Sequence, residues 1–505
     1  MLKRLSLLLF LPILIYSCKK DKETPVPLTM VETPQIATSP KAPLTVLLSF
    51  QTSHDSQVEI HINGPEPLVH QFPQSQITHE HIILGLYPDT NNEIILQITD
   101  DLDNLLLDTV YVQTQPLPAF FPDIEINTFN KNLTEPGWTF CDYHSGKNSH
   151  LETFPFIFDD SGMIRWYFDL SENSNLVFPI SRLKNGNVIY GVHDHIFEED
   201  MFGRRINDWP IQGFKQHHDI FEKQDGNILV AVNNLALTTS DDHIIELDRT
   251  SGTIINTWDL RQVLDLSRSV ISSSSVDWFH MNSVWHDPTD NSLIISGKYQ
   301  GLVKVSATNE LQWIMAPHKE WGTAGPNGDG LETSDYLLTA LDENGTPYPE
   351  AVQMGDERVS DFDWGWGQHA AMKLSNGNIM FFDNGHHRNF GTTPQNYSRM
   401  VEYRIDEANK TVQQIWSYGE NLGDPIYSRI ISDVDEHAQT NNRMVTYGIV
   451  WNNNSSYSKI RELRSSSNEV VFDANINFTN LENSNEFLWH HFDFLYRAER
   501  EELYK

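Results

Sequence analysis

The sequence predicts an all-β protein, a six-bladed β-propeller preceded by a small N-terminal β-sandwich. Three observations support this fold class. Short stretches of alternating polar and apolar residues fill residues 42–119. A strand–turn–strand pattern recurs through residues 120–505, and a second strand pair, most often ending in Trp, follows most of its copies.

The composition excludes several classes of protein. The 505 residues include 69 acidic and 35 basic side chains, which gives a formal net charge of −34. Because nucleic acids are bound by basic surfaces that release counterions, we expect no nucleic-acid partner. Hydrophobic residues make up 39% and charged residues 21% of the chain, so neither wholesale disorder nor a polytopic membrane protein fits.

Residues 1–17 are predicted to be a signal peptide. Lys3 and Arg4 precede an apolar stretch at residues 5–15, which is too short to span a bilayer. The sequence Ile15-Tyr16-Ser17-Cys18 resembles a bacterial lipobox, in which the cysteine is acylated and becomes the first residue of the mature chain. An ordinary signal peptide that is cleaved elsewhere is the alternative.

Lipidation of Cys18 predicts a lipoprotein that is anchored without a spanning helix. We therefore expect it on the periplasmic or cell-surface face of a bacterial outer membrane. Residues 18–41 contain several lysines and prolines and are predicted to be a tether. If Cys18 is acylated, Cys141 is the only thiol left, so no intramolecular disulfide is expected.

The sandwich is predicted over residues 42–119. Turn residues such as Asn63-Gly64 separate its short alternating stretches, and no helical period is present. The expected strands are residues 44–50, 58–62, 82–84, 93–99 and 109–113.

The repeat predicts the larger domain, over residues 120–505. Its clearest copies are residues 178–190, 218–230 and 369–381, each with an Asn-Gly or Asp-Gly turn eight residues after its first position. Weaker copies begin near residues 138, 280 and 434. Two hairpins per copy make a four-stranded sheet, and six such sheets make a propeller, with residues 488–495 expected as a closing strand. We expect Trp166, Trp258 and Trp416, near the ends of outer strands, to pack between blades.

Histidines occupy the first position of several copies. His218 and His369 both stand eight residues before a turn glycine, and His280 with Asn282 holds the like place in a copy with a longer turn. Alternate residues of a strand share a face, so His280 and Asn282 can both point toward a central channel. If these blades are neighbours, three imidazoles and one amide converge at the mouth of the channel.

Two chemistries suit such a cluster, besides a purely structural role. A divalent metal could bind three histidines, but zinc and iron sites usually recruit a carboxylate, and Asp219 faces away from His218 by strand alternation. A metal-free site would use one histidine as nucleophile or base. We expect neither a metal nor a cofactor, and we expect His217 and His386 to be structural.

The motifs at these positions resemble the bacterial aryl-sulfate sulfotransferase family, whose members do not use an activated nucleotide sulfate. The motifs are DWFHMNSV (residues 277–284), WGQHAAMKLSNGN (366–378) followed by FDNG (382–385), and HHDI (217–220). The resemblance covers the small sandwich and nearly the whole propeller. It implies the same two-domain architecture.

The resemblance also implies roles for single residues. His369 would be the nucleophile that takes the sulfuryl group as a sulfohistidine, with His218, His280 and Asn282 lining the sulfate pocket. Lys298 stands where the family has an arginine. A lysine keeps the positive charge but cannot donate the two parallel hydrogen bonds that a guanidinium gives to sulfate oxygens. Ser432 is the nearest match to a hydroxyl residue that completes the family's pocket.

The resemblance implies transfer of a sulfuryl group from a phenolic sulfate ester to a phenol acceptor by a two-step, ping-pong route. Two alternatives remain open at this point. One is a sulfatase-like reaction with water as the acceptor, and the other is a surface propeller that binds aromatic or sulfated ligands without turnover. A homodimer is a candidate assembly.

Overall fold

The computed structural model describes residues 27–146, 151–173, 177–272, 274–391, 397–452, 455–479 and 492–505. Within these ranges the chain forms seven β-sheets, and no helix is longer than four residues. The all-β class predicted from the sequence is therefore confirmed. None of the helices in these ranges has the length and apolar character needed to cross a membrane.

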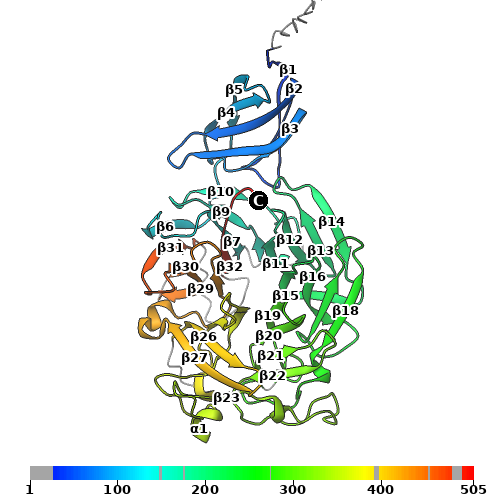
Figure 1. The fold of residues 1–505 in the computed structure, drawn as a ribbon, viewed down its shortest axis with the longest axis vertical. Helices are drawn as coiled ribbons and strands as arrows, with labels where there is room; N and C mark the ends of the chain where they lie inside the picture. Colours follow the sequence, from blue (N-terminus) through cyan, green and yellow to red (C-terminus); the bar gives the residue numbers. More distant parts are fainter. Residues whose placement is uncertain are drawn as a thin grey trace, which may run out of the picture.

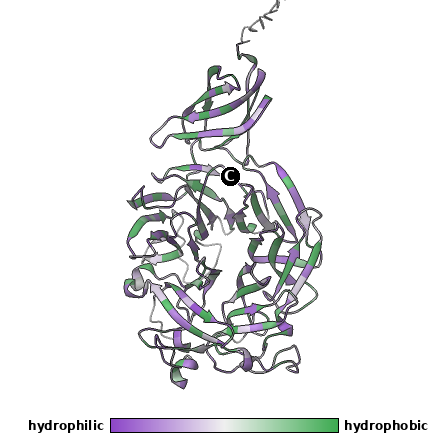
Figure 2. Cartoon of the chain, viewed as in Figure 1, coloured by the Kyte–Doolittle hydropathy of each residue, from purple (hydrophilic) through white to green (hydrophobic). Residues whose placement is uncertain are grey.

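The N-terminal domain is one sheet built around a long strand (Figure 1). Its strands are β1 (Met30–Thr38), β2 (Val46–Ile62), β3 (Leu68–Ile83), β4 (Asn91–Asp100) and β5 (Leu105–Gln113). The first half of β2 pairs with β1 and β3, and the second half pairs with β3 and β4. Every second residue of β2 from Val58 to Ile62 is buried, as the sequence alternation predicts, and Figure 2 shows hydrophobic residues spaced between hydrophilic ones along these strands.

The domain begins earlier than the sequence suggested. β1 lies inside the segment 18–41 that we expected to be a tether, and it pairs with β2 from Gln35 opposite Ser49 to Thr38 opposite Val46. β1 is an edge strand, and an edge strand tolerates proline, so its Pro34 was a misleading sign of a linker. Residues 1–26, with the predicted signal peptide and Cys18, lie outside the described ranges.

Six further sheets surround a centre in a propeller-like ring (Figure 1). The first sheet contains β7 (Trp138–Ser145), β8 (Glu152–Thr153), β9 (Phe156–Phe158), β10 (Ile164–Tyr167) and β32 (Phe494–Glu501). The second sheet contains β11 (Val177–Arg182), β12 (Val188–Val192), β13 (His195–Glu199) and β14 (Arg205–Pro210). The third sheet contains β15 (Phe214–Glu222), β16 (Ile228–Asn234), β17 (His243–Leu247) and β18 (Ile254–Asp259).

The fourth sheet contains β19 (Met281–Asp287), β20 (Ser292–Gly297), β21 (Gly301–Val305) and β22 (Leu311–Met315). The fifth sheet contains β23 (Thr339–Ala340), β24 (His369–Lys373), β25 (Ile379–Asp383), β26 (Arg399–Asp406) and β27 (Thr411–Tyr418). The sixth sheet contains β28 (Asp433–Glu436), β29 (Arg443–Asn452), β30 (Ser455–Leu463), β31 (Val470–Asn477) and β6 (Asp123–Phe129). Short helices in the connections are η2 (Leu260–Gln262), η3 (Thr333–Tyr336), α1 (Glu350–Gln353), η4 (Arg388–Phe390), η5 (Glu420–Leu422) and η6 (Asp424–Ile426).

Two strands from opposite ends of the chain close the ring. β6 joins the edge of the sixth sheet beside β31, and β32 joins the first sheet beside β7. The closing strand is therefore Phe494–Glu501, six residues later than the expected segment 488–495, whose first four residues lie outside the described ranges. The C-terminus ends where the ring meets the N-terminal domain, and the Tyr504 hydroxyl accepts a hydrogen bond from the Leu84 amide at 2.7 Å (Figure 1).

Tryptophans connect neighbouring sheets in a repeated way. In four sheets a tryptophan of the outer strand donates its indole N–H to an oxygen in a turn of the next sheet, at 2.9–3.0 Å. The pairs are Trp166 with Met201, Trp258 with Ser306, Trp313 with Glu407, and Trp416 with Asn468. The prediction that these residues pack between sheets is confirmed, and the repeat in the sequence reflects this contact.

Candidate functional site

The inner strands are irregular where the predicted histidines stand. The register of β15 shifts between Gln216 and Ile220, that of β19 between Met281 and Ser283, and that of β24 between His369 and Met372. The backbone adopts positive φ there, 43° at His218, 55° at His280 and 54° at Ala370. Such bulges re-aim side chains and are common beside functional sites.

A cavity of about 630 Å³ opens at these bulges. A volume of that size is typical of small-molecule sites. Its imidazoles are His193, His217, His218, His280, His369 and His386. Its cationic side chains are Lys215, Lys298 and Arg429, and its apolar and aromatic walls include Phe178, Ile430, Ile431, Phe494 and Tyr496. The structure therefore brings together His218, His280, His369 and Lys298, as the sequence predicted.

The surroundings of His369 fix which ring nitrogen carries its proton. The Asn384 amide group donates to the carbonyls of Ser428 and Ile431, each at 2.8 Å, so its Oδ1 must accept from His369. His369 Nδ1 lies 2.8 Å from that oxygen and 3.1 Å from the Gly367 carbonyl. Two acceptors at Nδ1 require a proton there, which leaves a lone pair on Nε2.

The cavity keeps the imidazoles of His369, His218 and His280 neutral. Burial, and next the nearby Lys298 charge, lower the pKa of His369 to about 3. Burial and the neighbouring His217 and His280 hold the pKa of His218 well below its ordinary value. Burial also lowers the pKa of His280, although the Asp277 carboxylate opposes that shift. A neutral imidazole has the free lone pair that a nucleophile or base needs.

His218 and His280 form a chain of ring contacts. Their Nε2 atoms lie 3.3 Å apart, and Nδ1 of His280 lies 2.7 Å from Asp277 Oδ2. Since the carboxylate accepts the proton of His280 Nδ1, His280 Nε2 accepts from His218. His218 Nδ1 lies 3.4 Å from the oxygen of the Tyr496 hydroxyl, which donates its proton to the Asn282 carbonyl at 3.3 Å. The pair therefore contacts Asp277 at one end and Tyr496 at the other.

Of the three cationic side chains that line the cavity, Lys298 and Arg429 are less exposed than Lys215. Burial, and repulsion from Arg429, lower the pKa of Lys298, while Asp277 opposes the shift. Sequence analysis did not single out Arg429, which stands three residues before Ser432 in the connection that leads to β28. Only its position shortly before the inner strand β28 could have indicated from the sequence that Arg429 lines the cavity. Its guanidinium can supply the forked donor that Lys298 lacks.

Asn282 and Ser432 do not line this cavity. Both line a smaller one of about 280 Å³, and Tyr496 lies in the walls of both. Asn282 donates from Nδ2 to the Gln368 carbonyl at 2.7 Å, while its Oδ1 has no hydrogen bond. The Ser432 hydroxyl donates to Ser428 Oγ at 2.9 Å. The substrate contacts expected of Asn282 and Ser432 remain predictions. The hydrogen bonds that the structure shows for these two side chains are with other protein groups and hold neighbouring segments in place.

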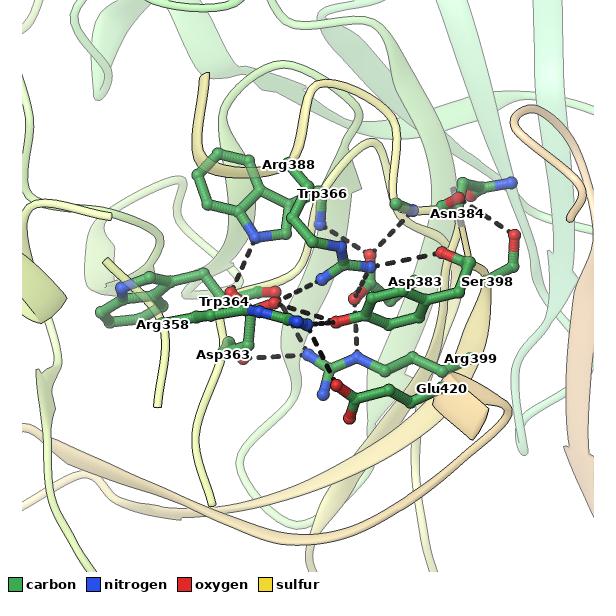
Figure 3. Close-up of polar contacts among 12 residues, drawn as sticks. Arg358, Asp363, Trp364, Trp366, Asp383, Asn384, Arg388, Ser398, Arg399 and Glu420 are labelled. Atoms are coloured by element: carbon green, nitrogen blue, oxygen red, sulfur yellow. Dashed lines mark hydrogen bonds and ion pairs between the residues drawn. The ribbon is translucent and has the colours of Figure 1, made fainter. Parts of the chain in front are cut away.

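A buried ionic network around Asp383 includes Arg388, Arg399 and Trp366, and Figure 3 shows these side chains beside Asn384, the hydrogen-bond partner of His369. The Asp383 carboxylate accepts from the Trp366 and Gly385 amides at 2.9 and 3.0 Å, and from Arg388 and Arg399 at 3.0 and 2.8 Å. Burial alone would raise the pKa of Asp383, but the two arginines outweigh it and lower that pKa. The network thus fixes the two segments that hold His369 and Asn384.

His217 and His386, expected to be structural, also line the cavity. The backbone irregularity at His218 turns His217 inward as well, so strict strand alternation fails there. His386 follows Gly385, whose φ of 74° turns the chain after β25. Cys141 is buried in the first sheet, where burial raises the pKa of its thiol well above the ordinary value. A buried neutral thiol is unreactive.

Comparisons with known proteins show which family the chain matches. Residues 106–486 match the model of the arylsulfotransferase (ASST) family, and residues 36–115 match that of the arylsulfotransferase Ig-like domain. The arylsulfate sulfotransferase AssT of Escherichia coli O6:H1 is 30% identical over 349 residues, which are 58% of this chain and 57% of that protein. AssT of Lelliottia amnigena is 26% identical over 493 residues, which are 78% of this chain and 81% of that protein.

The chain thus matches a little over half the length of the first of these relatives. Among solved structures, a protein of unknown function from Bacteroides caccae aligns with a TM-score of 0.42 and 10% identity, over 72% of this chain and 98% of that one.

Proposed function

Because the chain belongs to the arylsulfotransferase family, we propose that it acts as an aryl-sulfate sulfotransferase. It moves a sulfuryl group from a phenolic sulfate ester to a phenol, through a sulfohistidine at His369. We also assign each of the six ring sheets as one blade of a six-bladed propeller. The observation that carries the proposal is the tautomer of His369, whose Nε2 is unprotonated and whose ring lines a cavity together with Lys298 and Arg429.

In the first step Nε2 of His369 attacks the sulfur, and the S–O bond to the phenolic oxygen breaks. Its electron pair leaves on the phenolate. Lys298 and Arg429 lie where their charges stabilise the sulfuryl oxygens and the departing oxygen. A bound anion also offsets the mutual repulsion within the His218–His280 pair, so that pair can hold a proton and give it to the phenolate.

The second step runs the same chemistry in reverse. The acceptor phenol loses its proton to the His218–His280 pair while its oxygen attacks the sulfur of the sulfohistidine. The N–S bond breaks, and its electron pair returns to His369 Nε2. Imidazole is a suitable carrier because it leaves more readily than an alkoxide.

The test is to trap the covalent enzyme. A chromogenic aryl sulfate is added without acceptor, the reaction is quenched in alkali, and peptides are examined for a mass increase of one SO₃ group. We expect the label on His369 and a burst of one phenol per chain. His386→Ala, which changes another histidine of the same cavity, is the control and should keep the label. A label on another residue would move the nucleophile, and free sulfate formed without acceptor phenol would indicate hydrolysis.

We further propose that the chain is a lipoprotein of the bacterial outer membrane, anchored through Cys18. The lipobox-like sequence at residues 15–18 supports this proposal.

A further inference from the structure

A cluster of carboxylates and imidazoles lies on one side of the cavity. Potential ligand atoms of Asp241, Asp277 and His280 lie within 4.8 Å of one another, and so do those of His217, His218 and Asp241. Asp241 belongs to both groups. Its Oδ1 is 3.2 Å from His217 Nδ1, and its Oδ2 is 3.8 Å from His280 Nδ1.

Three atoms of this cluster are buried without a hydrogen bond. They are Asp241 Oδ1, Asp277 Oδ1 and His217 Nδ1. Asp241 is only 4% exposed. A buried carboxylate oxygen without a donor is costly, since it has lost its hydration and gained nothing in return. Asp241 belongs to both groups of potential ligand atoms, with its Oδ1 facing His217 and its Oδ2 facing His280, so these atoms from three separate segments lie around one carboxylate and indicate a missing positive partner.

The scaffold holds these segments together firmly. The Trp278 indole donates to Asp242 Oδ2 at 2.9 Å, and the Met281 amide donates to the Asp241 carbonyl at 3.1 Å. Asp241 itself has a φ of 58°, a strained conformation for a residue other than glycine. The connection before β17 is thereby fixed against the connection before β19. The cluster is preorganised and does not depend on a chance approach of surface side chains.

We propose that Asp241, Asp277, His217 and His280 bind a divalent transition-metal ion such as Zn²⁺. Two carboxylates and two imidazoles form a mixed oxygen and nitrogen set of the kind that zinc and its neighbours accept. His280 binds the ion through Nδ1 in place of its contact with Asp277. Its Nε2 then carries the proton and donates toward His218 and the cavity.

The sequence analysis predicted no metal site because the carboxylate it considered beside His218 was not one of the carboxylates proposed here as ligands. Asp219 was the candidate, and the structure occupies both of its oxygens, with Arg497 at 2.8 Å and the Val284 amide at 2.7 Å. Asp241 and Asp277 come from connections outside the strands, which the repeat pattern does not place in space. A bound ion adds positive charge beside the proposed sulfate site, but the metal site itself does not depend on the transfer reaction.

A proton on Asp241 is the rival explanation. Burial, and repulsion from Asp277, raise the pKa of Asp241 to about 8, so without an ion this carboxyl is protonated near neutral pH. The two explanations differ in a measurable way. Metal binding displaces that proton, so the heat of binding depends on the ionisation enthalpy of the buffer.

The test uses the full chain after treatment with a chelator. Titration with Zn²⁺ in a calorimeter should give one ion per chain with proton release, and Co²⁺ should give visible d–d absorption typical of nitrogen and oxygen ligands. Asp241→Asn and His217→Ala should each weaken binding by about a hundredfold, as removal of one ligand does. His386→Ala, a histidine of the same cavity outside the cluster, should bind normally.

Equal affinity of Asp241→Asn and the unchanged protein, or no saturable binding at all, would overturn the proposal. If Asp241→Asn fails to fold, Asp277→Asn replaces it, because that side chain is about a third exposed. The SO₃ label on His369 is measured separately. Absence of metal binding in the unchanged protein, with the label on His369 intact, would count against the metal site alone.

Discussion

Asn384 Oδ1 lies 2.8 Å from His369 Nδ1, and this contact decides the chemical state of the proposed nucleophile. The asparagine is fully buried and its amide hydrogens are both used by backbone carbonyls, so it cannot turn over to present a donor. The lone pair of His369 is therefore on Nε2 before any substrate binds. The orientation of the Asn384 side-chain amide thus sets the tautomer of His369 in advance.

Asn384→Ala should lower kcat, because His369 can then adopt the other tautomer or rotate. One lost hydrogen bond of about 1.5 kcal/mol corresponds to roughly a tenfold loss. Steady-state assay with an aryl sulfate measures it, and circular dichroism checks the fold. Asn409→Ala, in an exposed turn between β26 and β27, is the matched control. An unchanged kcat in Asn384→Ala would show that the tautomer is fixed by Gly367 alone.

Lys298→Ala and Arg429→Ala should each reduce kcat/KM by about a hundredfold, because charged donors at enclosed sites are worth about 3 kcal/mol. Lys298→Arg should retain or improve activity, since it restores a forked donor. Lys319→Ala removes a partly exposed lysine paired with Asp356 and should be silent. If Lys298→Ala matches the unchanged protein while Arg429→Ala is inactive, Arg429 is the sole sulfate clamp.

Ser432→Ala should affect stability more than substrate binding. The Ser432 hydroxyl donates to Ser428 and accepts from the Gly448 amide at 3.1 Å, so its loss should cost about 1–2 kcal/mol of unfolding free energy. Urea unfolding and KM are measured on the same preparation. A large rise in KM with unchanged unfolding would restore the direct substrate contact that the family resemblance implies.

Asp383→Asn should destabilise the ring by about 3–5 kcal/mol at pH 7, because buried Arg399 loses the carboxylate it pairs with and buried Arg388 keeps only Asp363. The folded pKa of Asp383 is below its unfolded value, so its stabilising contribution is full above about pH 4 and is lost as pH falls further. The difference between variant and unchanged protein should shrink in acid unfolding experiments. The exposed Asp406→Asn is the control, and a pH-independent difference would exclude an ionic origin.

Cys18→Ser should release the protein from the membrane fraction with its specific activity unchanged. Acyl chains on Cys18 are the proposed anchor, and Cys18 lies outside the strands that form the described domains, of which β1 at Met30–Thr38 is the first. Sedimentation of cell fractions measures the effect. Cys141→Ala changes the other cysteine and should leave the protein in the membrane fraction. A Cys18→Ser protein that still sediments would indicate an uncleaved signal or a different anchor.

The local pattern of the sequence determined the strands and their repeat. Turn glycines and alternating apolar residues act over a few neighbours, so β15, β16, β24 and β25 could be placed from them directly. The same repeat marked His218 and His369, which both stand eight residues before a turn glycine, and it marked His280 as the first position of a copy with a longer turn. The packing of the tryptophans at the ends of outer strands could also be predicted from the repeat, because their contacts recur from sheet to sheet.

The tertiary structure alone decided which side chains share one cavity. Arg429, His217 and Asp241 lie on bulges and connections, where backbone direction depends on packing and not on strand alternation. Asn282 and Ser432 stand at the expected register, yet the same irregularity directs them to the smaller cavity. The protonation of His369 depends on Asn384, fifteen residues away, and on the carbonyls of Ser428 and Ile431 in the connection that leads to β28. Such contacts arise only when the ring closes.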